Sequence, residues 1–249
     1  MLTVANYIAT TLADLGVRHV FMITGGGAMF LNNAFGHEPR IRYTCHHHEQ
    51  ACAMAAEGYA RITNQPGVIC VTTGPGGINA LNGVFGAWVD SIPMLIISGL
   101  VKRETCLATY QIPGLRQIGD QEADIISLVK GITKYAVLVD DPSTIRYHLE
   151  KAWRLTRSGR PGPCWLDIPI DVQASTIDPA TLKGYNPSEE NLTIQPADLS
   201  HICQQVITKI QASRRPVILA SKGIHLANND RFSPSWQKAR CKKLFGLFY

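Results

Sequence analysis

The stretch GVICVTTGPGGINALNGVFGAWVDSIPMLIIS, residues 67–98, decides the fold. Its first part, Gly67 to Thr72, is a run of apolar and β-branched residues typical of a buried strand, and Gly74-Pro75-Gly76-Gly77 ends that run. Residues 78–89 then have the pattern of a helix, and Met94 to Ser98 is a second apolar strand. A strand, a helix and a strand in this order predict a right-handed crossover between two parallel strands.

The same alternation extends to both sides of this stretch. Toward the amino terminus, Thr3 can cap a helix that Gly16 ends, and the strand from His19 to Ile23 opens onto Gly25-Gly26-Gly27. The other predicted elements are strands over residues 40–44, 135–139 and 164–168 and helices over residues 49–61, 123–129 and 142–158. The sequence therefore predicts an α/β fold, a parallel sheet flanked by helices on both faces, with ligands bound at the carboxyl ends of its strands.

The composition changes after this alternating region. Residues 1–172 form the first predicted domain, and residues 173–196, rich in Ser, Thr, Pro, Asp and Asn, are predicted to be a linker. A helix from Ala197 to Ile210 and a strand from Pro216 to Ala220 indicate that a second α/β domain begins within residues 197–227. Residues 228–249 show neither the apolar periodicity of a helix nor that of a strand, so we expect a divergent tail after a truncated second domain.

Composition and charge exclude several classes of protein. The chain is 45% hydrophobic and 17% charged, with a net charge of +5 that forms no basic stripe for nucleic acid. No apolar run approaches the length of about 18 residues that a membrane span needs. The seven cysteines form no Cys-x-x-Cys pair, and Cys45, Cys52, Cys70 and Cys164 have apolar neighbours that predict buried thiols. We therefore expect a cytoplasmic protein that binds neither nucleic acid nor membrane.

The run His46-His47-His48-Glu49 lies at a predicted strand-to-helix junction. Successive residues of a strand point to opposite faces, so these histidines cannot converge on one ion, and we expect no metal site. Glu49 is open to two interpretations. It is either a favourable first-turn charge on the helix dipole or a carboxyl in a partly dry cleft that protonates a ligand nitrogen.

The two glycine clusters, Gly25-Gly26-Gly27 and Gly74-Pro75-Gly76-Gly77, allow a ligand to approach the backbone closely, although each alone is compatible with a tight turn. Neither matches the dinucleotide fingerprint or the phosphate-binding loop with its lysine. A nicotinamide-dependent oxidoreductase is therefore not supported.

Taken together, the motifs resemble those of thiamine-diphosphate-dependent enzymes of the acetolactate synthase kind. In chain order they are His48-Glu49-Gln50-Ala51 with Glu57-Gly58-Tyr59-Ala60-Arg61, Thr73-Gly74-Pro75-Gly76 with Asn79, Asp90-Ser91-Ile92-Pro93 before Ser98-Gly99, Asp120-Gln121-Glu122, Thr133-Lys134, and Gly159-Arg160-Pro161-Gly162-Pro163 with Asp167-Ile168-Pro169. The resemblance covers roughly residues 1–225 and identifies the first domain with the pyrimidine-binding domain of that family.

The resemblance implies a role for individual residues. Glu49 would be the catalytic carboxyl that hydrogen-bonds the cofactor's aminopyrimidine ring and promotes its imino tautomer. The cofactor-binding residues would be Gly25, Gly26, Thr73, Gly74, Pro75 and Asn79. Gln121 would lie in the substrate region. The implied activity is that of a transferase or lyase, the decarboxylation and carboligation of a 2-keto acid such as pyruvate. Residues 115–122 also resemble relatives that act on nucleotide-linked keto-sugars, so the acceptor substrate stays open.

One part of the family pattern is missing. The carboxyl-terminal domain of such enzymes binds Mg²⁺ and the diphosphate through a Gly-Asp-Gly motif and an asparagine, and some members carry FAD in the central domain. This sequence contains no Gly-Asp-Gly. The resemblance therefore implies that only the pyrimidine half of thiamine diphosphate is bound here, by a chain that is inactive alone. We expect a homodimer, or pairing with a full-length or complementary subunit. The alternative is a non-catalytic binding or regulatory remnant that pairs with a full-length relative.

Overall fold

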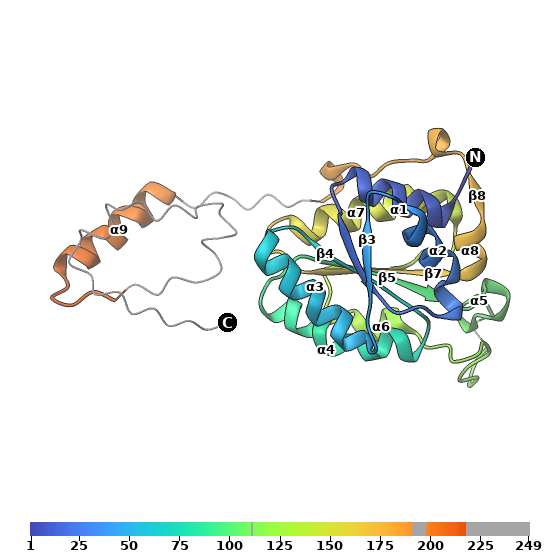
Figure 1. Ribbon diagram of the computed structural model, residues 1–249. Coiled ribbons are helices and arrows are strands. Elements are labelled where there is room, and N and C mark those ends of the chain that lie inside the picture. The colour runs from blue at the N-terminus through green and yellow to red at the C-terminus, as the bar shows by residue number, and fades with distance from the viewer. Residues whose placement is uncertain (111, 191–197, 218–249) are drawn as a thin grey trace. The chain divides into compact units, whose positions relative to one another are not determined.

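Six parallel strands form a central sheet in the order β3-β2-β4-β5-β7-β6 (Figure 1). They are β2 (His19–Met22), β3 (Arg42–Cys45), β4 (Gly67–Val71), β5 (Met94–Leu100), β6 (Tyr135–Leu138) and β7 (Pro163–Pro169). The computed structural model describes residues 1–110, 112–190 and 198–217, and the chain divides into two compact units, Met1–Glu190 and Asn191–Tyr249. The sheet lies in the first unit and confirms the predicted α/β fold.

Helices cover both faces of the sheet (Figure 1). One face is covered by α1 (Val4–Asp14), α2 (Met29–His37), α7 (Ile145–Arg157) and α8 (Ile170–Ala174), and the other by α3 (Glu49–Thr63), α4 (Pro75–Val89) and α6 (Ile125–Val129). The short α5 (Leu107–Tyr110) follows β5, and α9 (Leu199–Ala212) belongs to the second unit.

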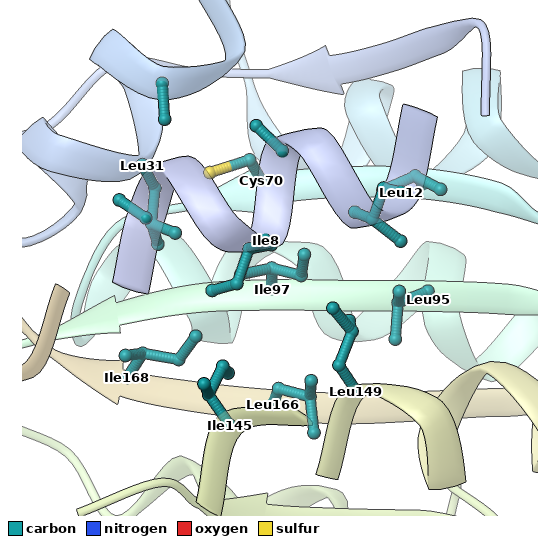
Figure 2. Close-up of a cluster of buried hydrophobic side chains, with 14 of the residues drawn as sticks. Ile8, Leu12, Leu31, Cys70, Leu95, Ile97, Ile145, Leu149, Leu166 and Ile168 are labelled. Atoms are coloured by element: carbon teal, nitrogen blue, oxygen red, sulfur yellow. The ribbon is translucent and has the colours of Figure 1, made fainter. Parts of the chain in front are cut away.

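Strand β4 shows why the strands of this sheet are apolar without a break. All five of its residues are buried. Val68 and Cys70 pack in the cluster under α1, α2 and α7, whereas Ile69 and Val71 pack in the cluster under α3, α4 and α6. Figure 2 shows the first of these clusters, in which side chains from the helices meet those of the strands. Because both faces are covered, every position along the strand favours an apolar side chain.

Helices α3 and α4 lie close together at Gly83. A methyl group at this position would lie 2.5 Å from Cβ of Ala53 and 3.0 Å from the backbone nitrogen of Met54. The absence of a side chain at Gly83 therefore permits this helix pair to pack closely, which in turn places the first turns of both helices side by side at the candidate site.

We expect Gly83→Ala to lower the free energy of unfolding by about 1–3 kcal/mol, because the added methyl overpacks this contact. Gly58→Ala on α3 is the matched control, since a side-chain carbon there would meet nothing within 4 Å. The control should gain about 0.5–1 kcal/mol from better helix propensity. Urea unfolding followed by circular dichroism measures both changes, and equal effects of the two substitutions would contradict this account of the packing.

Helix α4 begins earlier than predicted, at Pro75 instead of residue 78. Pro75 occupies the first helical position, where its fixed φ and missing N–H are both tolerated. Side-chain carbons on Gly76 and Gly77 would lie 2.7 Å from Cγ2 of Thr72 and 3.1 Å from Cδ1 of Ile125, so these positions favour glycine. Gly76 and Gly77 thus belong to the first turn of a helix, and only Gly74 precedes it, with φ of +54°.

Residues 173–190, predicted to be part of a linker, pack against the first unit. Glu150 of α7 accepts a hydrogen bond from the backbone nitrogen of Tyr185 at 2.8 Å, and Lys151 forms an ion pair with Glu190 at 2.8 Å. The first unit therefore extends to Glu190. The polar composition misled the prediction because this segment is held by charged side chains of α7.

The start of the chain pairs with this same segment. Strand β1 (Leu2–Thr3) lies antiparallel to β8 (Thr176–Ile177), and the side chain of Thr3 accepts a hydrogen bond from the backbone nitrogen of Asn6 at 3.2 Å. Thr3 is thus the cap of α1, as predicted, and Gly16 follows the helix with φ of +94°.

The prediction that four cysteines are buried is partly wrong. Cys45 is exposed, because β3 is the edge strand of the sheet, whereas Cys52, Cys70 and Cys164 are buried as predicted.

Most of the strand predicted over residues 216–220 and the whole tail over 228–249 lie outside the described residues. In the part of the chain that the structure describes, no helix combines the length and apolar character needed to span a membrane.

Candidate cofactor and substrate site

The two glycine clusters meet at the carboxyl ends of neighbouring strands. The chain leaves β2 toward β3 on one side of the sheet and leaves β4 toward β5 on the other. The loops after β2 and β4 therefore diverge, which creates the crevice where open α/β sheets bind ligands. Gly25 to Gly27 follow β2, and Thr72 to Gly77 follow β4.

These two loops are in direct contact. A side-chain carbon on Gly25 would lie 2.5 Å from Cβ of Thr72, and one on Gly27 would lie 3.1 Å from Cβ of Thr73. A carbon on Gly26, in contrast, would meet nothing within 4 Å. Gly25 and Gly27 are therefore needed for packing between the loops, whereas Gly26 borders open space.

Glu49 is the first residue of α3 and is only 8% exposed. Asn79 of α4 donates a hydrogen bond from Nδ2 to Oε2 of Glu49 at 3.0 Å. The other oxygen, Oε1, has no hydrogen-bond partner among the described residues and would lie 3.4 Å from a side-chain carbon on Gly76. Oε1 is therefore available to a ligand group, and Gly76 places only backbone beside it.

The predicted residues around Glu49 form one contiguous group. Thr72 touches the positions that side-chain carbons of Gly25 and Gly76 would occupy, and Gly76 lies beside Glu49. Contact between the helices α3 and α4 thus joins the carboxyl to both glycine clusters.

Gln121 reaches the site through its backbone. A side-chain carbon on Gly74 would overlap the carbonyl oxygen of Gln121, and both residues have φ of +54°. Glu122, whose role sequence reasoning missed, accepts hydrogen bonds from the backbone nitrogens of Leu107 at 2.7 Å and Gly119 at 3.1 Å. The carboxylate of Glu122 therefore fixes the segment that places Gln121 against Gly74.

A second buried carboxyl lies nearby. Asp167 of β7 is 3% exposed and accepts a hydrogen bond at Oδ1 from Oγ of Ser98 at 2.5 Å. Ser98 in turn accepts a hydrogen bond from Nε1 of Trp165 at 2.7 Å. Removal from water raises the pKa of Asp167 to about 7. This carboxyl can therefore hold a proton near neutral pH.

Asp167 and residues of the second glycine cluster surround a narrow gap that has no room for a water molecule. The other lining residues are Thr72, Thr73, Gly74, Gly77, Ser98, Gly99, Leu100, Ala123 and Ile125. The hydroxyl oxygens of Thr72 and Thr73 are buried without a hydrogen-bond partner among the described residues. In the sequence, Asp167 stands out as a charged residue within the apolar run 164–168. Nothing in the sequence indicates that Ser98 is its hydrogen-bond partner.

The described residues contain no group of three His, Cys, Asp or Glu side chains placed to bind a metal ion. The three consecutive histidines differ in exposure: His46 is partly buried, whereas His47 and His48 are exposed, and Nδ1 of His48 caps α3 by accepting from the backbone nitrogen of Gln50 at 3.1 Å. The buried carboxyls Glu49 and Asp167 and the open space beside Gly26 are the features of this site that bear on its chemistry.

Comparison with known proteins agrees with this geometry. The model of the family described as thiamine pyrophosphate enzyme, N-terminal TPP binding domain, matches residues 2–126. The acetolactate synthase large subunit of Lactococcus lactis subsp. lactis (strain IL1403) is 33% identical over 233 residues, which are 90% of this chain and 37% of that protein. Acetolactate synthase 1, chloroplastic, of Nicotiana tabacum is 34% identical over 234 residues, 91% of this chain and 32% of that protein. The chain thus spans about a third of the length of these relatives.

Proposed function

Since this chain belongs to the family of thiamine pyrophosphate enzymes, we propose that its first unit binds the aminopyrimidine ring of thiamine pyrophosphate and that Glu49 hydrogen-bonds this ring. The observation that supports the assignment best is the buried Glu49 carboxyl, with Oε2 bonded to Asn79 and Oε1 without a partner among the described residues. A ring nitrogen of the ligand could form a hydrogen bond with Oε1.

The residues around Glu49 fit such a ring. When bound, thiamine pyrophosphate supplies the electron sink for reactions of 2-keto acids. Glu49 would hold or accept a proton at Oε1, and Asn79 would keep the carboxyl oriented through Oε2. The open space beside Gly26 would allow a flat ring to approach the backbone, while Thr73, Gly74 and Pro75 would line the other side of the crevice. Burial of Glu49 would exclude water and strengthen each of these interactions.

The similarity to acetolactate synthases supports a 2-keto acid such as pyruvate as the substrate class, with Gln121 at the substrate region. The whole activity needs more than these residues. We propose that Mg²⁺ and the diphosphate are bound by another polypeptide segment, on a second or complementary subunit, and that the described unit alone does not turn over substrate. Such pairing would form a complete site between two chains.

Calorimetric titration of the purified chain tests the pyrimidine assignment. Thiamine pyrophosphate and thiamine should both bind, whereas the isolated thiazole alcohol, 5-(2-hydroxyethyl)-4-methylthiazole, should not, because it lacks the aminopyrimidine ring. Equal affinity for thiamine and the thiazole alcohol would contradict the assignment. Pyruvate decarboxylation by the chain alone would contradict the need for a second segment. If the chain binds no thiamine compound but alters the activity of a full-length relative, a regulatory role is favoured.

We expect Gly26→Ala to weaken thiamine pyrophosphate binding while leaving the free energy of unfolding within about 0.5 kcal/mol of the wild type, because its methyl points into open space. Gly25→Ala should instead destabilise the fold by about 1–3 kcal/mol, since its methyl collides with Thr72. Thermal unfolding and titration of both variants separate the two effects. Unchanged affinity of Gly26→Ala would show that the ring does not lie at this position.

A further inference from the structure

Gln173 of α8 is 0% exposed and connects the end of the first unit's sheet to its first glycine cluster. Its Nε2 donates hydrogen bonds to the carbonyl oxygen of Gly27 at 2.7 Å and to that of Ile168 at 2.8 Å. Its Oε1 accepts from the backbone nitrogen of Leu31 at 3.4 Å. A single buried amide thus joins the end of β7, the start of α2 and the glycine loop.

The carbonyl of Gly27 is enclosed on two sides. Strand β5 passes so close that a side-chain carbon on Gly99 would overlap this carbonyl oxygen. On the other side the oxygen accepts its hydrogen bond from Gln173. A buried carbonyl without a donor is costly, so the Gln173 amide determines where this oxygen can lie.

The same peptide group is also held at its other end. The backbone nitrogen of Ala28, which belongs to the peptide of the Gly27 carbonyl, donates to the carbonyl oxygen of Gly25 at 3.1 Å. Because a peptide group is planar, fixing its oxygen and its N–H fixes its orientation. Gln173 therefore orients the turn that runs from Gly25 to Ala28.

Helix α8 is itself anchored, so it can act as a fixed support. Asp171 accepts hydrogen bonds from the backbone nitrogen of Arg103 at 2.9 Å and from its Nε at 2.6 Å. The bond from Gln173 to Ile168 ties the amide to the strand from which α8 starts. The short helix that carries Gln173 is thus tied by hydrogen bonds both to Arg103 and to the end of β7.

We propose that Gln173 is a positioning residue for the loop Gly25–Gly27 and thereby sets the affinity of the crevice for the pyrimidine ring, a role that rests on the proposed function. Gln173 is fully buried, and within the glycine loop its hydrogen bond goes to Gly27. It acts through the orientation of the Gly27 peptide.

The test compares Gln173→Met, which keeps the volume but removes all three hydrogen bonds, with Gln173→Glu, which keeps the acceptor and replaces the donor. Thr156→Val is the matched control, because Thr156 is fully buried and loses one hydrogen bond to the Trp153 carbonyl on α7. Each full-length chain is labelled with ¹⁵N-glycine, and the amide signals of Gly25, Gly26 and Gly27 are recorded. Thermal unfolding and titration with thiamine pyrophosphate follow on the same samples.

We expect Gln173→Met to shift or broaden the Gly26 and Gly27 signals and to weaken thiamine pyrophosphate binding about tenfold or more, the size of effect that a small misplacement produces. Thr156→Val should leave these signals and the affinity unchanged even at a similar loss of thermal stability. Signals in Gln173→Met that match those of Thr156→Val would overturn the proposal, as would moved signals with unchanged affinity.

Two further outcomes are also decisive. If Gln173→Met does not fold, the same comparison is made with Gln173→Glu, whose shape is that of the native side chain. If the wild-type chain does not bind thiamine pyrophosphate, the proposed function fails, and the proposed effect on affinity fails with it. The glycine signals then still decide whether Gln173 positions the loop.

Discussion

Glu49→Ala is expected to weaken the binding of thiamine pyrophosphate about 10- to 100-fold, because a hydrogen bond to a charged group contributes about 1.5–3 kcal/mol. In the native chain Asn79 occupies Oε2 of this carboxyl, and Oε1 is left for the ligand. Alanine removes both contacts and leaves the Asn79 amide without its acceptor. Titration calorimetry measures the change in affinity, and circular dichroism shows whether the variant is folded.

Glu49→Gln tests whether the site needs a carboxyl at this position or only a hydrogen-bonding side chain. Glutamine can still accept from Asn79, but its amide cannot take up or release a proton toward the ring. We expect a loss of affinity intermediate between the wild type and Glu49→Ala. Glu57→Gln, on the same helix but in an ion pair with Arg61, is the control and should bind like the wild type. Equal affinities of the wild type, Glu49→Ala and Glu57→Gln would refute the role proposed for Glu49.

Asp167→Asn is expected to make the chain more stable above neutral pH and to leave it unchanged near pH 4. The pKa of Asp167 is about 7 in the folded chain, against an ordinary value of 3.8. Between these values the folded chain keeps a proton that the unfolded chain has released. The free energy of unfolding therefore falls as pH rises from about 4 to about 7, by up to about 4 kcal/mol, and this contribution is fully lost above pH 7.

Asparagine cannot ionise and can still accept from Ser98, so the variant should not show this part of the pH dependence. Urea unfolding at intervals between pH 4 and 8.5 measures the difference between the two chains. Asp141→Asn is the control, because hydrogen bonds from the backbone and side chain of Ser143 lower the pKa of Asp141. The stability that Asp141 contributes is present above its ordinary pKa of 3.8 and is lost only at lower pH, so this variant should differ from the wild type by a nearly constant amount between pH 4 and 8.5. A constant difference between wild type and Asp167→Asn over this range would mean that Asp167 is ionised throughout.

The fold could be predicted from the sequence because its signals are local. The run from Gly67 to Thr72 and the glycines after it predict a strand and a turn wherever they occur, and alternation of such units predicts a parallel sheet. The order of the strands is not local. Ser98 and Asp167 meet because β5 lies beside β7 with these two residues in register, 69 positions apart. No sequence pattern within either strand predicts that pairing.

In the candidate site, too, local features could be predicted and contacts between distant segments could not. Glu49 and the glycine clusters could be chosen as candidates because they lie at junctions between predicted elements. The contacts of Glu122 and Gln173 could not be predicted, because their partners are backbone groups of distant segments and every residue carries such groups. The segment 173–190 was assigned to a linker for a related reason: its polar composition says nothing of the charged face of α7 that holds it.

The bond between Gln173 and Gly27 also has a consequence for the order of events during protein synthesis. Gly27 leaves the ribosome 146 residues before Gln173, a delay of about 7–30 s at ordinary rates of translation. Strand β1 likewise waits for β8, whose residues follow Gln173. The nascent chain can form its first βα units early, but the glycine loop acquires its final support only when β7 and α8 have emerged.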